Sequence, residues 1–178
     1  HRDLKPSNIM ITPQGHVTWQ TNVGSPVYGR VVRGTNELLY VTNYQGQLLA
    51  LTAAGTTQWK ISLEGPIETA PVKGSDGTLY VAAYGLYAIS PDGNIRWRFV
   101  TAAPLQTTPA LHPDQFVIVG TMDGNVLAIN RHGQLAWQYD TQSSIAAEIL
   151  VRTDGTLYVG TDGVGLLALD LGQHGLPV

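Results

Sequence analysis

The chain has 178 residues, a formal net charge of −3 and only 13% charged residues, and it contains no cysteine. This length is enough for one or two domains with a sizeable core. The lack of cysteine excludes disulfides, thiolate metal sites and cysteine nucleophiles. The lack of a lysine and arginine run argues against nucleic-acid binding, and no apolar run is long enough for a membrane-spanning helix.

The first element in chain order is the octapeptide HRDLKPSN at residues 1–8, which begins without methionine or a signal-peptide pattern. We therefore expect the chain to be a piece of a longer protein. The octapeptide fits the catalytic-loop pattern H-R-D-L-x-x-x-N at every fixed position. Residues 1–17 resemble the bacterial eukaryotic-type Ser/Thr protein kinases. The resemblance implies that Asp3 would accept the substrate hydroxyl proton, Lys5 would steady the γ-phosphate and Asn8 would hold Mg²⁺.

The sequence contains no other part of a kinase ATP site. The glycine-rich loop G-x-G-x-x-G-x-V, the VAIK lysine, the DFG motif and the APE motif are all missing. Phosphoryl transfer depends almost entirely on positioning and electrostatics, which one loop cannot supply. We therefore interpret residues 1–17 as a remnant of a kinase catalytic loop without activity here. ATP and Mg²⁺ are implied only for an intact parent kinase.

Residues 8–20 are predicted to form a β-hairpin that is compatible both with a kinase and with the repeat described in the next paragraph. The stretch NIMITPQGHV contains a strand, a turn with Gly15 and a second strand, and it is followed by Trp19. In kinases a hairpin also follows the catalytic loop. The boundary of the kinase-like sequence therefore lies within residues 9–17.

A repeat of about 40 residues governs the rest of the chain. Four tryptophans are spaced by 40, 38 and 40 residues, and a glycine stands four residues before each of them. Several short strand-like runs separated by Asp-Gly turns occur in each unit, which is typical of β-propeller blades. We expect the glycines to need a positive φ and the tryptophans to pack against the adjacent blade, with ligand stacking as the alternative. These residues are Trp19, Trp59, Trp97, Trp137, Gly15, Gly55, Gly93 and Gly133.

The predicted fold is all-β, a partial propeller of four-stranded antiparallel blades over residues 8–178. Each blade should have an inner strand, two central strands and an outer strand that carries the tryptophan. Three blades are predicted to be complete, with one hairpin before them and three strands after them. Either the two end pieces share a fourth blade or further blades are missing, and we favour the second. The predicted ranges are 8–20, 21–59, 60–97, 98–137 and 141–170.

The segments LYAISPDGNIRWRF and VLAINRHGQLAWQY resemble the PQQ-like (pyrrolo-quinoline quinone-like) repeat family. That family includes quinoprotein dehydrogenases, outer-membrane assembly scaffolds and propellers attached to bacterial Ser/Thr kinases. The dehydrogenases are usually marked by vicinal cysteines and acidic metal ligands around the cofactor. This chain has no cysteine and no acidic cluster outside its turns, so we expect no quinone and no other cofactor in it.

A few other side chains are candidates for chemistry or binding. His112 and His132 stand in turn-like contexts and are expected to be exposed rather than metal-bound. Six tyrosines are expected to pack in the core or between blades. Four polar residues of inner strands are the candidate lining of a central channel. The tyrosines are Tyr28, Tyr40, Tyr80, Tyr84, Tyr87 and Tyr158, and the channel residues are Thr69, Thr107, Thr108 and Glu148.

Three functions are implied by these resemblances. The kinase-like residues favour a sensing or interaction propeller of a bacterial Ser/Thr kinase, which would be cytoplasmic because no membrane segment separates residue 17 from the blades. The alternative is a periplasmic scaffold propeller of the outer-membrane assembly type. A quinoprotein dehydrogenase is the least favoured. The partner, whether a protein or a small molecule, is not identified by the sequence.

Overall fold

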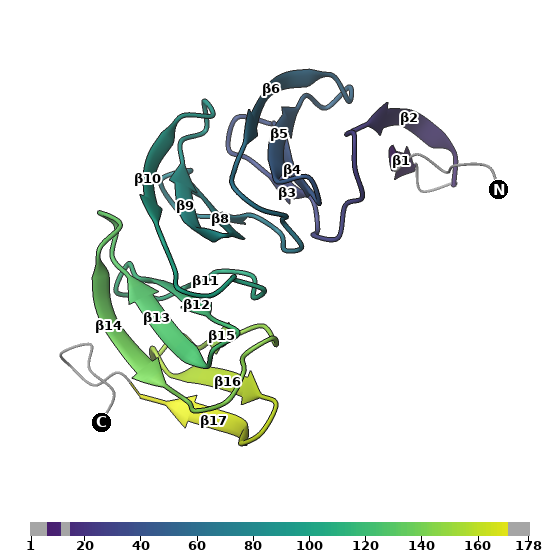
Figure 1. Cartoon of the computed structure of the whole chain (residues 1–178). Coiled ribbons are helices and arrows are strands. Elements are labelled where there is room, and N and C mark those ends of the chain that lie inside the picture. The colour runs from purple at the N-terminus through teal and green to yellow at the C-terminus, as the bar shows by residue number, and fades with distance from the viewer. Residues whose placement is uncertain (1–6, 12–14, 171–178) are drawn as a thin grey trace.

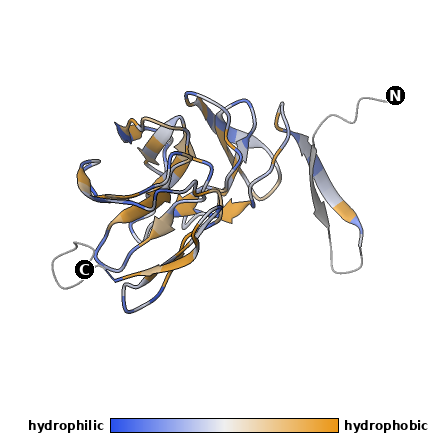
Figure 2. Ribbon diagram, turned by 60° about the horizontal axis from the view of Figure 1, so that its bottom comes forward, coloured by the Kyte–Doolittle hydropathy of each residue, from blue (hydrophilic) through white to orange (hydrophobic). Residues whose placement is uncertain are grey.

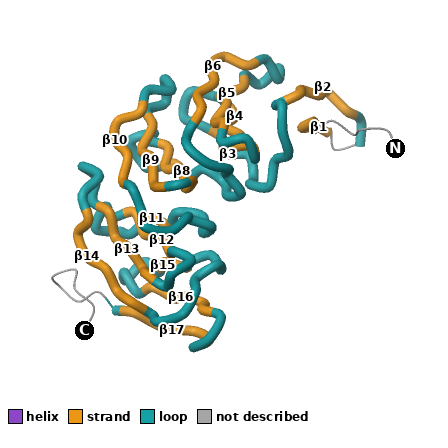
Figure 3. Tube along the Cα trace, in the orientation of Figure 1, coloured by secondary structure: helices purple, strands orange, loops and turns teal. Residues whose placement is uncertain are grey.

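The computed structural model describes residues 7–11 and 15–170, and this part of the chain consists of strands and loops alone (Figure 3). The strands form five antiparallel sheets that follow one another along an arc (Figure 1). Within every sheet consecutive strands are neighbours, so each sheet is a simple meander. Four-stranded meanders arranged around an axis are propeller blades. The predicted all-β partial propeller is confirmed.

Three blades are complete, as predicted from the tryptophan spacing. The first consists of β3 (Val32–Arg33), β4 (Leu39–Asn43), β5 (Gln47–Leu51) and β6 (Thr57–Ser62). The second consists of β7 (Val72–Lys73), β8 (Leu79–Ala83), β9 (Gly85–Ile89) and β10 (Ile95–Phe99). The third consists of β11 (Ala110–Leu111), β12 (Val117–Gly120), β13 (Asn125–Ile129) and β14 (Leu135–Asp140).

A partial sheet lies at each end of the arc. The hairpin of β1 (Ser7–Ile11) and β2 (Val17–Asn22) is at one end. The three-stranded sheet at the other end consists of β15 (Leu150–Val151), β16 (Leu157–Thr161) and β17 (Gly165–Leu169). The two pieces lie far apart in Figure 1 and do not pair with each other. They therefore do not combine into a shared fourth blade.

The core lies between neighbouring blades. The central strands β5 and β9 are buried along nearly their whole length, whereas the outer strand β6 alternates between exposed and half-buried residues. One cluster joins Leu48 of the first blade to Leu79 of the second, and Figure 2 shows that much of the hydrophobic colour lies on strands. Burying one leucine fully contributes about 1.5–3 kcal/mol. Contacts between neighbouring blades therefore contribute to the stability of each blade.

The hairpin of the third and outer strands is repeated with the same register in four places. Trp19 pairs with Met10, as Trp59 pairs with Ala50 in the first blade. In each hairpin the register shifts just before the turn. The turn glycines have the positive φ that was expected, between 77° and 86°, which glycine adopts without steric cost. Residues 9–11 and 17 thus belong to a hairpin of the propeller kind.

The shorter tryptophan spacing of 38 residues in the second blade has a local cause. Tyr84 alone joins β8 to β9, and Ala83 pairs directly with Gly85. In the first blade the residues 44–46 join β4 to β5. Gly85 has a φ of 139°, which allows the chain to reverse within so short a turn.

Candidate functional site

The residues that resemble a kinase catalytic loop lie mostly outside the described structure. Asp3 and Lys5 are outside the described residues. Asn8 lies in β1, where its backbone is paired with Thr21 of β2. The interpretation of residues 1–17 as a kinase remnant stays a prediction.

Tryptophans of one blade lie on the turn glycines of the next. The Nε1 of Trp59 donates a hydrogen bond to the carbonyl oxygen of Pro91 at 3.1 Å, and a Cβ on Gly93 would lie 2.9 Å from the Trp59 ring. Only glycine lets a ring and a turn approach this closely. We call these contacts the blade seams. The same contacts join Trp19 to Ala53 and Gly55, and Trp97 to Arg131 and Gly133.

The seam tryptophans also contact tyrosines of their own blades. The ring centroids of Tyr40 and Trp59 are 5.8 Å apart, and those of Tyr80 and Trp97 are 5.9 Å apart. These rings are therefore occupied by contacts within the protein. Trp137 is buried, and no described residue accepts a hydrogen bond from its Nε1.

The four candidate channel residues divide into two kinds. Thr107 is fully buried and its hydroxyl bonds to the backbone of Gly120 at 3.0 and 3.3 Å, and Thr69 is also buried. Thr108 remains accessible and donates to Glu148 at 3.0 Å across a blade boundary. An open groove of about 250 Å³ beside them is also lined by Arg30, Glu68 and Gln106.

The prediction that His112 is exposed was wrong. Its ring is buried, and its Nε2 lies 3.0 Å from the carbonyl oxygen of Gly155 in the C-terminal sheet. The ring also lies beside Phe116, with centroids 6.0 Å apart. A turn residue is buried here because the turn of the following sheet covers it. His132 is exposed, as predicted.

The expectation that the tyrosines pack inside was right for Tyr40 and Tyr87, which are buried. It was wrong for Tyr28 and Tyr84, which are about half exposed or more. Tyr44, which the sequence did not single out, is exposed as well. The signal that could have found these side chains is their position beside glycine in turns and connections, where no neighbouring strand covers them.

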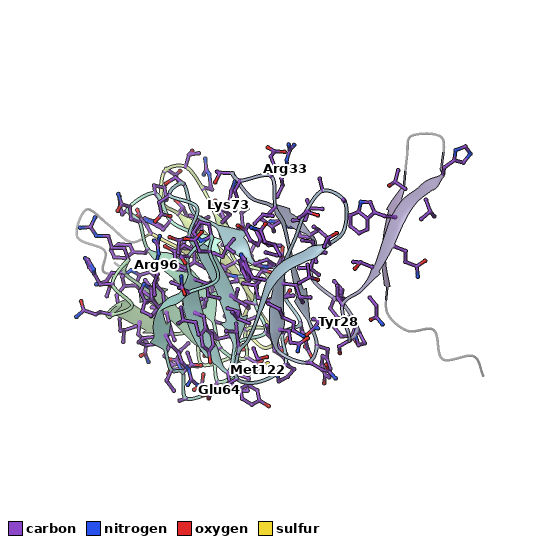
Figure 4. All side chains as sticks on the ribbon, turned by 90° about the horizontal axis from the view of Figure 1, so that it is seen from above. Tyr28, Arg33, Glu64, Lys73, Arg96 and Met122 are labelled. Carbon is purple, nitrogen blue, oxygen red and sulfur yellow. The ribbon has the colours of Figure 1, made fainter. Side chains whose placement is uncertain are left out.

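The two ends of the strands form two different faces of the arc. The turns between second and third strands lie beside the connections between blades. Leu63 N, in a connection, donates a hydrogen bond to the turn residue Gly46, and Tyr84 N, in a turn, donates one to Glu64 O in the same connection. We call this side the connection face. Figure 4 shows Tyr28, Glu64 and Met122 on this side. Its residues are 22–31, 44–46, 62–71, 84, 99–109, 121–124, 140–149 and 162–164.

The opposite side, which we call the turn face, carries the remaining turns, and Figure 4 shows Arg33 and Lys73 toward it. Its charged residues are largely paired. Arg96 contacts Asp76 at 3.0 Å and Arg152 contacts Asp154 at 3.4 Å, while Arg33 contacts Glu37. The turns of this face are residues 34–38, 52–56, 74–78, 90–94, 112–116, 130–134 and 152–156, and the adjoining strand residues Arg33, Lys73 and Arg96 also belong to it.

Hydrogen bonds within one of these turns hold a carboxylate in its charged form. The hydroxyl and amide of Thr78 donate to Asp76 at 2.6 and 2.9 Å, and Arg96 adds a further bond. The bonds from Thr78, and to a smaller extent those from Arg96, lower the pKa of Asp76. This arrangement stabilises the turn.

Possible metal ligands and open grooves of the described residues are the last features of the surface. No group of three or more His, Asp or Glu side chains is placed to hold a metal ion within residues 7–11 and 15–170. An open groove of about 460 Å³ between the second and third blades is lined by Asp76, Tyr80, Gln115 and Arg131. Within the same ranges, no helix has the length and apolar character needed to cross a membrane.

The sequence of residues 9–162 matches a PQQ-like repeat family whose model is described as outer membrane protein assembly factor BamB. The match covers all three complete blades and parts of both end pieces. It begins after the octapeptide, so the kinase resemblance depends on a stretch that lies largely outside the match. No protein with a curated description matches the sequence.

Solved structures share the fold at low sequence identity. BamB from Moraxella catarrhalis has a TM-score of 0.76 and 19% identity over 92% of this chain and 55% of its own. Sqt1 from Saccharomyces cerevisiae has a TM-score of 0.80 and 11% identity over 97% of this chain and 54% of its own. A protein of unknown function from Bacteroides caccae has a TM-score of 0.67 and 16% identity, with coverages of 95% and 66%. The chain therefore spans between about half and two thirds of these structures.

Proposed function

Because the chain belongs to the PQQ-like repeat family described as outer membrane protein assembly factor BamB, we propose that it is part of a scaffold propeller that binds other proteins outside the inner membrane. The observation that carries this proposal is the family match over residues 9–162, which includes every complete blade. Under this proposal the chain works by contact alone. Neither pyrrolo-quinoline quinone nor another cofactor has a role in it.

The geometry is suited to such a scaffold. The blade seams and the clusters between blades hold neighbouring sheets together, and the turns and connections lie at the surface. A rigid framework that displays loops is a common basis for binding sites. Three ion pairs lie on the turn face, whereas Glu64 is the one carboxylate of the connection face that forms an ion pair within the described residues.

The test is the cellular location of the complete parent protein and the identity of the proteins that co-purify with it. We expect an epitope-tagged parent to be released with the periplasmic fraction or to sediment with the outer membrane. After mild crosslinking we expect it to co-purify with outer-membrane β-barrel assembly proteins. A parent that remains in the cytosolic fraction and crosslinks to none of these proteins would contradict the proposal.

A second candidate is favoured by one specific observation, the octapeptide HRDLKPSN at residues 1–8. Its fit to the kinase pattern supports a propeller attached to a bacterial Ser/Thr kinase, with cytoplasmic blades and with ATP and Mg²⁺ bound by the kinase part. The complete open reading frame separates the two candidates. A glycine-rich phosphate loop and a VAIK lysine upstream of His1 support the kinase, whereas a signal peptide supports the scaffold.

A further inference from the structure

A large apolar side chain occupies the same turn in each complete blade. The turns between second and third strands carry Tyr44, Tyr84 and Met122, which are 44%, 49% and 40% exposed. Turns of this kind usually carry glycine, asparagine, aspartate or serine, because these residues suit the backbone and are hydrated easily. Equivalent turns on one face of the arc therefore each present a large apolar side chain to solvent, and clustered apolar side chains of this kind are a common feature of protein-binding surfaces.

These side chains form a row along the arc, and the two tyrosines in it are held by neighbouring groups. The rings of Tyr28 and Tyr44 meet edge to face with centroids 5.7 Å apart. The ring of Tyr84 lies on Gly65, where an added Cβ would be only 2.5 Å from it. Figure 4 shows Tyr28 and Met122, from opposite parts of the row, on the same side of the arc. Side chains that are already held in place lose little conformational entropy when a partner binds.

The same face carries an excess of negative charge. It has six acidic residues, and the arginines that reach it are Arg30 and Arg98. Arg98 is engaged with Glu64, through contacts of 2.8 and 2.6 Å. Within the described parts of the chain no ion pair involves the other five carboxylates, which are all exposed. These are Glu68, Asp123, Asp140, Glu148 and Asp162.

From this combination we propose that the connection face binds a basic polypeptide segment of a partner protein, one that carries both large apolar side chains and lysine or arginine. The apolar side chains pack against Tyr44, Tyr84 and Met122, and the cationic groups meet the five carboxylates that form no ion pair. Opposite charges across an interface favour this class of partner and repel acidic ones. The inference rests on the proposed scaffold function and specifies the partner that such a scaffold accepts.

Three synthetic peptides of equal length test the chemistry of the partner, with the full chain as the receptor. The first combines leucine and tryptophan with lysine, the second replaces every lysine by glutamate, and the third replaces every apolar residue by serine. Titration calorimetry is expected to show binding of the first peptide that is at least about tenfold tighter than that of the other two. Equal binding of the lysine and glutamate peptides, or no binding of the first peptide, overturns the proposal.

Matched variants test the place of binding. The double variant Tyr84→Ser/Met122→Ser is expected to weaken binding of the first peptide by about tenfold, because anchors near the centre of an interface dominate its affinity. Ile95→Ser/Leu135→Ser is the control. These two side chains have similar exposure, 49% and 43%, but they lie at the ends of β10 and β14 that adjoin the turn face. An equal loss in both double variants contradicts the assignment of this face.

A charge variant keeps the test valid if the apolar variant folds poorly. Glu68→Gln/Glu148→Gln is expected to weaken binding of the first peptide by about threefold and to make it less sensitive to salt. Asp92→Asn on the turn face is the control and should leave both unchanged. Thermal unfolding by circular dichroism verifies that every variant is folded. Unchanged affinity and salt dependence in the glutamine variant overturn the role of the carboxylates.

The peptide titrations and the fractionation of the parent protein test the docking surface and the scaffold function separately. If the first peptide binds as expected but the parent is cytosolic, the scaffold function is wrong and the docking surface stands. If the parent is found with the outer membrane but the first peptide does not bind, the scaffold function stands and the docking surface is wrong.

Discussion

The N-terminal hairpin β1–β2 and the hairpin β9–β10 of the second blade have the same backbone plan and different neighbours. Both shift register before the turn, and both have a turn glycine with positive φ, 82° at Gly15 and 86° at Gly93. Among the described residues, none lies within 4 Å of a Cβ placed on Gly15, whereas the Trp59 ring lies 2.9 Å from one placed on Gly93. The backbone of such a hairpin is thus formed by local interactions. The close packing at the Gly93 turn comes from Trp59 of the preceding blade.

The largest effect is expected where the neighbour is removed. Trp59→Ala should lower the free energy of unfolding by about 3 kcal/mol, because it deletes a large ring from the boundary between two blades. Urea unfolding followed by far-ultraviolet circular dichroism measures this, with the exposed neighbour Lys60→Ala as a control that should be almost neutral. A loss below about 1 kcal/mol for Trp59→Ala would show that the seam contributes little.

The second prediction compares the two hairpins directly. Alanine at a left-handed φ costs about 1–2 kcal/mol at either glycine. Gly93→Ala should cost about 2 kcal/mol more than Gly15→Ala, because its Cβ must displace the Trp59 ring. Equal losses in urea unfolding would mean that the neighbouring ring does not constrain the turn. In the Trp59→Ala background the difference between the two alanine variants should disappear.

A smaller effect is expected when the ring is kept and its polar contact is lost. Trp59→Phe removes the hydrogen bond from Nε1 to the carbonyl oxygen of Pro91. The expected loss in the free energy of unfolding is about 1 kcal/mol. If Trp59→Phe is as destabilising as Trp59→Ala, packing of an aromatic ring is not the main contribution of the seam.

The smallest effect is expected at a turn whose contacts are local. Bonds from Thr78 and Arg96 lower the pKa of Asp76 in the folded protein. The stability that this carboxylate contributes is therefore present above its unfolded pKa, about 3.9, and is lost as pH falls through the lower folded pKa. Asp76→Asn should cost less than about 1 kcal/mol at neutral pH because the site is exposed.

Below about pH 4 the difference between wild type and Asp76→Asn should shrink. Acid titration of the unfolding midpoint measures it. The first blade supplies a natural comparison, since Asn36 stands at the equivalent place and accepts a bond from Leu38 N at 3.4 Å. A difference that grows as the pH falls would contradict the assigned direction of the pKa shift.

Most of the fold could be predicted because its determinants are repeated. The tryptophan spacing indicated the number of blades, and the glycine four residues earlier marked each hairpin turn. The fate of single turn residues could not be predicted in the same way. His112 is buried by Gly155, which is 43 residues away in sequence, whereas Tyr84 is exposed although it stands between two buried strands.

The sequence by itself determined that the chain is built of propeller blades, which residues form the hairpins and where glycine is required, because these features depend on short-range periodicity and backbone conformation. Only the tertiary structure decided which side chains the neighbouring blade covers. It placed Thr107 inside, left Glu148 accessible and put Tyr28 and Met122 on the same face. The physical reason is that burial in a propeller is set by contacts between blades, and residues about 40 positions apart meet only when the blades are stacked.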